Sequence, residues 1–180
     1  MNHYNFANSF HALYDQAVTL YAQGERCVQN YFNVEQVEWL SQNGLSAQNL
    51  YDYAEDHHNQ GGEPGFDVAL GIEYVRRDYF INVQTSNPTG VIADPATWPA
   101  KTAAVRGIEW LPRILPKTRA KLSGELPTSL MYCCGGDRRF FKAHDIHPVE
   151  FLNLVWRLGA NDEAIHDWVI ARSNDSPSKV

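Results

Sequence analysis

A short stretch in the second half of the sequence combines anion-binding residues with a glycine turn. Gly135-Gly136 precede Asp137, and Arg138 follows directly. We expect the two glycines to form a turn and Asp137 to cap a short helix, which leaves backbone N–H groups at the positive end of the helix dipole. Arg113, from the preceding helix, would complete a fork for a carboxylate or phosphate with Arg138. The alternative is a plain turn whose arginines pair with acidic residues elsewhere.

Two adjacent cysteines, Cys133 and Cys134, come just before this turn. Adjacent cysteines rarely close a disulfide because the ring is strained. A thiolate beside Arg138 and a helix start would be a nucleophile, so Cys133 and Cys134 are candidate catalytic residues, with a buried structural role as the alternative. The third cysteine, Cys27, reads as ordinary packing. Three cysteines make no disulfide framework, which predicts a reducing, cytoplasmic environment.

Carboxylates around a second glycine-rich loop are candidates for acid/base chemistry. This loop is Gly61-Gly62-Glu63-Pro64-Gly65, and it contains Glu63 and is followed closely by Asp67. Asp137 is a further candidate in the second half of the chain. A carboxylate held partly buried gains a raised pKa and can act as a general base. Arg77 and Tyr79 on the following helix would help to bind a carboxylate substrate. Ordinary surface charge is the alternative for this group.

A metal site is an outside alternative. Glu55 and His58 lie three residues apart on one helix face, and Glu163 and His166 repeat that spacing. Di-iron carboxylate bundles use such pairs together with a glutamate from each of two further helices. Glu73 is one candidate for such a glutamate, and no second one stands out. Solvated helix ends are the expected state of these residues.

Helical periodicity positions most of these side chains. The expected helices span residues 9–23, 33–44, 46–58, 66–83, 111–124, 137–141, 148–158 and 161–172. Pro116 should kink or restart its helix, and residues 85–105 should form a long ordered loop. The predicted fold is therefore all-α, a compact bundle of about seven or eight helices. Residues 1–172 form one domain, or two lobes at 1–84 and 100–172, before a disordered tail at 173–180.

Charge and composition exclude several classes of protein. The net charge is −6, yet residues 101–142 hold nine of the fifteen basic residues and three of the 21 acidic ones. An acidic chain with one basic segment argues against nucleic-acid binding. It fits a local anion pocket, or a contact between this segment and the acidic remainder. No apolar run of about 18 residues and no signal-like start is present, so we expect no membrane segment and no secretion.

One part of the sequence resembles a known family. The passages that carry the resemblance are Gly107-Ile108-Glu109-Trp110-Leu111-Pro112-Arg113, Lys117 to Gly124, Tyr132 to Phe141 and the closing helices from His147 to Val169. They are similar to a bacterial family catalogued only as a domain of unknown function, over roughly residues 100–172. The resemblance implies a small, mainly helical protein and brings no catalytic residues with it. Pro116 departs from the polar residue expected there.

Three functional hypotheses follow. The first is a small-molecule enzyme of the lyase, isomerase or hydrolase type, without a cofactor, which acts on a carboxylate- or phosphate-bearing metabolite. The second is a non-enzymatic helical module that binds a ligand or partner. The third is a metal-dependent enzyme with Glu and His ligands. Self-association as a homo-oligomer is compatible with each of them.

Overall fold

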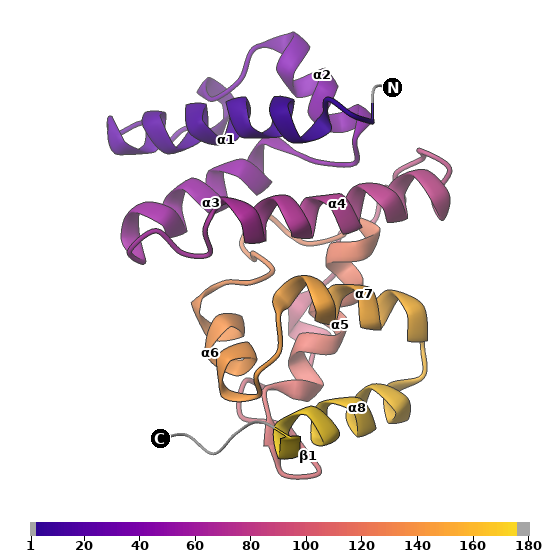
Figure 1. Ribbon diagram of the computed structural model, residues 1–180. Helices are drawn as coiled ribbons and strands as arrows, with labels where there is room; N and C mark the ends of the chain where they lie inside the picture. The colour runs from indigo at the N-terminus through magenta and orange to yellow at the C-terminus, as the bar shows by residue number, and fades with distance from the viewer. Residues whose placement is uncertain (1–2, 176–180) are drawn as a thin grey trace. The chain divides into compact units, whose positions relative to one another are not determined.

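The structure is a computed structural model that describes residues 3–175 (Figure 1). Eight α-helices, two short 3-10 helices (η1, Val28–Asn30, and η2, Pro95–Thr97) and one two-stranded hairpin form its regular structure over these residues, so the predicted all-α fold is confirmed. The helices are α1 (Phe6–Ala22), α2 (Val34–Gln42), α3 (Ala47–Asn59), α4 (Phe66–Asn82), α5 (Leu111–Ser123), α6 (Gly135–Ala143), α7 (Pro148–Leu158) and α8 (Asp162–Asp175). The described helices include none with the length and apolar character needed to cross a membrane.

Contacts along the chain divide it into two compact units, Met1–Thr89 and Gly90–Val180. In the first unit α1 packs against α3 and α4. Its core is aromatic, and the rings of Phe10 and Phe66 have centroids 6.2 Å apart. Aromatic rings at such distances add stabilisation beyond the area that they bury. The first unit therefore has a hydrophobic core of its own.

Local sequence signals set the helix starts of the first unit. Asn33 and Gln36 form a reciprocal capping box at the start of α2, as their spacing predicts. Gly44 follows α2 with φ of 74°, and a Cβ at this position would lie 2.6 Å from Phe80 Cγ. Only glycine fits both the left-handed backbone and the close approach of α4.

In the second unit α5 packs against α7, and α7 packs against α8. The hairpin consists of β1 (Ala104–Val105) and β2 (Ile108–Glu109), which pair antiparallel with Val105 opposite Ile108. Arg106 and Gly107 form its two-residue turn and both have positive φ, the geometry that suits such tight hairpins. The predicted loop at 85–105 did not anticipate this hairpin.

The helix α5 begins directly after the hairpin. Its N-cap, Trp110, has a left-handed backbone with φ of 69°, which is rare for a bulky residue. Pro112 occupies the first turn, where a missing N–H costs nothing. Pro116 lies inside α5, which continues through it as one helix. Of the two outcomes expected at Pro116, a kink or a restart of the helix, the restart is therefore wrong.

Two other predicted boundaries are corrected. α6 begins at Gly135 with Cys134 as its N-cap, and no side chain caps it. The pair Gly135-Gly136 is therefore the first part of the helix instead of a turn, and Asp137 does not cap it. α8 extends to Asp175, so the predicted tail is helical as far as that residue. Residues 176–180 lie outside the described part of the chain.

Candidate functional site

A buried ion pair joins α5 to α6 in the second unit. Lys117 Nζ lies 2.7 Å from Asp137 Oδ2, and the two side chains are 6% and 0% exposed. The same oxygen accepts the backbone N–H of Cys133 at 2.9 Å, and Oδ1 accepts the indole N–H of Trp110 at 3.0 Å. Buried charges are tolerated where each is paired and its remaining hydrogen-bonding capacity is used. Asp137 meets this condition through three separate donors.

The ammonium of Lys117 has a second partner in Cys134, whose Sγ lies 3.2 Å away. Burial acts to lower the pKa of Lys117, but the charge of Asp137 and the sulfur of Cys134 outweigh it, so the pKa lies above its ordinary value. Lys117 therefore stays charged throughout the neutral range. The pair fixes α5 against α6.

The indole of Trp110 is held on two sides. Its Nε1 is bound by Asp137, and Gly136 contacts its benzo ring so closely that a Cβ there would lie 2.7 Å from Cζ2. Real Cβ atoms essentially never come this near to another heavy atom. Gly136 thus allows the indole to lie against the first turn of α6. Trp110 is a fixed wall because of these two contacts.

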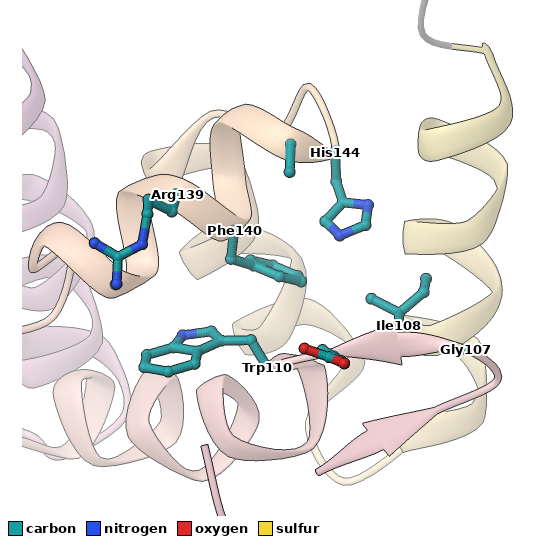
Figure 2. Close-up of a pocket in the computed structure, with 9 residues that line it drawn as sticks. Gly107, Ile108, Trp110, Arg139, Phe140 and His144 are labelled. Atoms are coloured by element: carbon teal, nitrogen blue, oxygen red, sulfur yellow. The ribbon is translucent and has the colours of Figure 1, made fainter. Parts of the chain in front are cut away.

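A pocket opens beside this wall, between the hairpin and α6 (Figure 2). Its volume is about 380 Å³, which is near the lower end of the range for small-molecule sites. It is lined by Gly107, Ile108, Glu109, Trp110, Gly136, Arg139, Phe140, Ala143 and His144. In Figure 2, Arg139 and His144 lie towards opposite ends of the hollow, with Trp110 and Phe140 between them. All of these residues belong to the second unit.

Two charged side chains that line the pocket form no hydrogen bond or ion pair within the described part of the protein. These are the side chains of Arg139 and Glu109, and both are exposed. Most other basic side chains of the basic segment are engaged with protein atoms. A guanidinium whose N–H groups form no hydrogen bonds to the described residues can donate them to a carboxylate or phosphate.

The tautomer of His144 follows from its neighbour. Ser173 Oγ donates to the carbonyl of Val169 at 2.7 Å, and His144 Nδ1 lies 2.8 Å from the same Oγ. A hydroxyl has one hydrogen to donate. Because Ser173 has given it to Val169, the contact with His144 requires Nδ1–H as the donor. The neutral imidazole therefore has its lone pair on Nε2.

The two arginines predicted to form a fork are bound to separate backbone carbonyls. Arg138 is buried, and its Nη1 donates to the carbonyl of Cys133 at 2.7 Å. Arg113 Nη1 donates to the carbonyl of Pro99 at 2.8 Å, and its guanidinium lies over the ring of Trp98. Neither arginine lines the pocket. Asp137, the predicted acid/base residue beside them, has both oxygens engaged.

The cysteines differ sharply in exposure. Cys133 is 0% exposed, while Cys134 is half-buried and Cys27 is exposed. Cys133 also has a left-handed backbone with φ of 69°, which turns its N–H towards Asp137. Of the two adjacent thiols, Cys134 is the one within reach of solvent.

The remaining predicted residues belong to the first unit. Glu63 is half-buried, Asp67 is exposed and Tyr79 is half-buried. Arg77 is buried, with Nε 2.6 Å from Asn43 Oδ1, and its burial lowers the pKa of the guanidinium. The same side chain contacts His3 Nδ1 through Nη1 at 3.2 Å and lies over the ring of Phe6. Arg77 thus packs inside the first unit.

Three of the metal-ligand candidates, Glu55, His58 and Glu163, contact neighbouring side chains, whereas the buried Nδ1 of His166 has no hydrogen-bond partner among the described residues. Glu55 Oε1 accepts the hydroxyl of Tyr21 at 3.2 Å, and the ring of His58 packs on the same tyrosine. Glu163 forms an ion pair with Arg106. Across the part of the chain that the structure describes, no three His, Cys, Asp or Glu side chains form a group that could hold a metal ion.

Two pocket residues, Glu109 and Trp110, carry no signal of a site in the sequence. Arg139 stands beside Arg138 as part of the predicted anion site, and His144 forms a candidate metal pair with His147 three residues on. The sequence did contain one signal for Arg139. Arg138 and Arg139 are adjacent, and an α-helix turns adjacent side chains to different sides, so the two cannot both be buried in the same contact. Arg138 points into the protein, and Arg139 points to the pocket. The tertiary contact between Trp110 and Gly136 has no local signature.

No curated protein and no solved structure matches the chain. Residues 100–179, which include every residue of the pocket, match the family described as "Domain of unknown function (DUF5069)", and this confirms the resemblance predicted for this part of the chain.

Proposed function

We propose that the protein is a small-molecule enzyme that performs acid/base chemistry on a carboxylate- or phosphate-bearing metabolite, and that the pocket between the hairpin and α6 is its site. The main observation in support is that the same pocket is lined by two groups with complementary roles. One is the guanidinium of Arg139, which has no hydrogen bond or ion pair to the described residues, and the other is the imidazole of His144, whose neutral tautomer is set by Ser173. The first predicted set of residues is thereby replaced by Arg139, His144 and Glu109.

Arg139 supplies the binding charge. Its planar guanidinium matches the two oxygens of a carboxylate or phosphate in a bidentate geometry. The aromatic and aliphatic lining, from Trp110, Phe140 and Ile108, keeps water away from one side of a bound anion. A charge-assisted hydrogen bond is stronger in such a partly dry site than in bulk water.

His144 supplies the base. The lone pair on Nε2 accepts a proton from an acidic C–H bond of the substrate, and the electron pair of that bond delocalises into an adjacent carbonyl group. Ser173 stabilises the imidazolium that forms, because its Oγ keeps accepting the Nδ1 hydrogen. Return of the proton to the same carbon completes an exchange, and its delivery to a neighbouring atom completes an isomerisation. Where the adjacent carbon carries a leaving group, the electron pair expels that group, which takes the proton, and the step is an elimination. Glu109 is the second titratable group that lines the site.

The test uses exchange with heavy water, because its readout does not depend on which product forms. The protein is incubated in deuterium oxide with carboxylates that carry a C–H bond next to a carbonyl group, and deuterium incorporation is followed by NMR. Incorporation that disappears in His144→Gln supports the proposal. If a carboxylate binds through Arg139 but no deuterium is incorporated, the pocket is a binding site and the enzymatic part of the proposal is wrong.

Binding is tested separately by calorimetry. Arg139→Gln should weaken the binding of a carboxylate by about tenfold or more, the scale of one charged hydrogen bond. Arg157→Gln is the matched control, since Arg157 is an exposed arginine on α7 that does not line the pocket. Equal losses in the two variants would show a general charge effect and contradict the assigned site.

A further inference from the structure

We infer that the ligand of this pocket is a flat-ring acid: an aromatic or heteroaromatic ring that bears a carboxylate or phosphate. The inference rests on the proposed function, because it takes the Arg139 end of the pocket as the anion-binding end. It adds the shape and chemistry of the rest of the molecule. The argument comes from the two aromatic side chains that lie between Arg139 and His144.

The first aromatic surface is rigid before any ligand binds. Trp110 is fixed by the hydrogen bond from Nε1 to Asp137 and by its contact with Gly136. Asp137 is in turn fixed by Lys117 at 2.7 Å. A side chain that is already ordered loses no rotamer freedom on binding, so its contact energy is retained in full.

The second aromatic surface is equally constrained. Phe140 is 5% exposed, and its ring lies among the rings of Phe141, His144 and Phe151, with centroid distances of 5.6, 4.8 and 6.2 Å. Its remaining exposed edge lines the pocket. The pocket therefore offers fixed aromatic contacts from two elements, the indole of Trp110 before α5 and the edge of the Phe140 ring on α6. Stacked and edge-to-face contacts of this kind favour an aromatic ring over a puckered aliphatic ring of equal size.

The ends of the pocket set the polarity of the ligand. The guanidinium of Arg139 binds the acidic group at one end, and the imidazole of His144 meets the opposite end of the ligand (Figure 2). A flat ring between them carries the acidic group towards Arg139 and the reacting proton towards His144. A volume of about 380 Å³ suits one ring with its substituents better than a dinucleotide or a long chain.

The test compares two probes of equal charge and similar size, benzoate and cyclohexanecarboxylate, by calorimetry on the full chain. We expect benzoate to bind about three- to tenfold more tightly, which is the range that aromatic pairing adds beyond buried area. Phe140→Leu should reduce this preference, while Arg139→Gln should weaken both probes alike. The comparison on the unchanged protein decides the matter even where Phe140→Leu fails to fold.

The outcomes separate the inference from the function on which it rests. Equal affinity for the two probes, or tighter binding of cyclohexanecarboxylate, overturns the flat-ring inference and leaves the anion site standing. Binding of acetate or inorganic phosphate with no binding of benzoate has the same meaning. Failure of every anion, including phosphate, to bind the protein overturns the proposed function and the inference together.

Discussion

Trp110 Nε1 and Asp137 Oδ1 lie 3.0 Å apart, so a side chain that forms the wall of an open pocket is fixed by a carboxylate from the interior of the domain. Asp137 is 0% exposed and is balanced by Lys117. Asp137 thus links the buried ion pair with Lys117 to the position of the Trp110 indole, which lines the pocket. Changes at Lys117 or Gly136 should therefore affect both stability and binding.

Replacement of Lys117 by Met should destabilise the protein by about 3–5 kcal/mol, because it leaves the buried carboxylate of Asp137 without a counter-charge. Urea denaturation measures this loss. Lys101→Met is the control, and as an exposed lysine it should change the free energy of unfolding by no more than about 0.5 kcal/mol. Similar values for the two variants would show that the ion pair contributes little.

Two neighbouring glycines provide a matched comparison. Gly136→Ala should displace the indole of Trp110 and destabilise the protein by about 1–3 kcal/mol, the usual cost of overpacking. At Gly135 the nearest contact of an added Cβ is Arg138 Nη2 at 3.7 Å, so Gly135→Ala has room. The latter should be neutral or stabilising by about 0.5–1 kcal/mol, because alanine favours the helix. Thermal denaturation with the same sign for both would contradict the close contact at Gly136.

Ser173→Ala tests the tautomer of His144. Loss of the Oγ acceptor should allow the Nδ1-protonated and Nε2-protonated forms to interconvert, and nitrogen NMR of the imidazole reports this directly. Proton exchange on a bound substrate should fall by about tenfold, within the range that a positioned base contributes. Ser129→Ala, at an exposed loop serine, is the control. An unchanged imidazole spectrum in Ser173→Ala would mean that Ser173 does not set the tautomer.

The three cysteines should react at different rates with a thiol reagent. Cys27 is exposed, Cys134 is half-buried and Cys133 is 0% exposed. We expect Cys27 to react first, Cys134 more slowly, and Cys133 only after unfolding. Mass spectrometry of peptides from the labelled native protein measures this order. Labelling of Cys133 at the rate of Cys27 would contradict the described packing.

The alkaline limit of stability should involve Tyr31. Its burial, chiefly, and the nearby Tyr51 raise the pKa of Tyr31 to about 12. Because the unfolded tyrosine loses its proton near pH 10, the folded state binds more protons between about pH 10 and 12, and stability falls as the pH rises through this window. Tyr31→Phe should make this fall less steep.

Tyr4→Phe is the control for Tyr31→Phe, since Tyr4 is 96% exposed. Denaturant unfolding across the alkaline range compares the slopes of the two variants with that of the unchanged protein. At neutral pH Tyr31→Phe should cost about 1 kcal/mol, for the hydrogen bond from its hydroxyl to the carbonyl of Glu25 at 2.9 Å. Equal slopes for all three proteins would contradict a raised pKa for Tyr31.

Helix positions were predictable because their signals are local. Asn33 with Gln36 identified the start of α2, Pro148 identified the start of α7, and Gly124 identified the end of α5. The start of α6 was misplaced because Asp137 looks like a cap in the sequence. Its carboxylate is instead used by Lys117 and Trp110, which are 20 and 27 residues away.

The site was harder to predict than the fold for the same reason. Arg138 and Arg139 are equivalent in the sequence, and only the packing of α6 decides which of them is buried. The role of His144 depends on Ser173, 29 residues further along the chain. The hairpin at Ala104–Glu109 is too short to show strand periodicity. Long-range partners therefore determine the pocket, whereas local signals determine the helices.

The hairpin that carries Glu109, and that is followed directly by Trp110, is also attached to α8. Arg106, in its turn, forms ion pairs with Glu163 and Asp167 on α8, and all three side chains are substantially exposed. Dissolved salt screens exposed ion pairs and barely affects buried ones. We therefore expect ionic strength to act on one wall of the pocket: concentrated salt should loosen the turn from α8, while Trp110 should stay bound to Asp137.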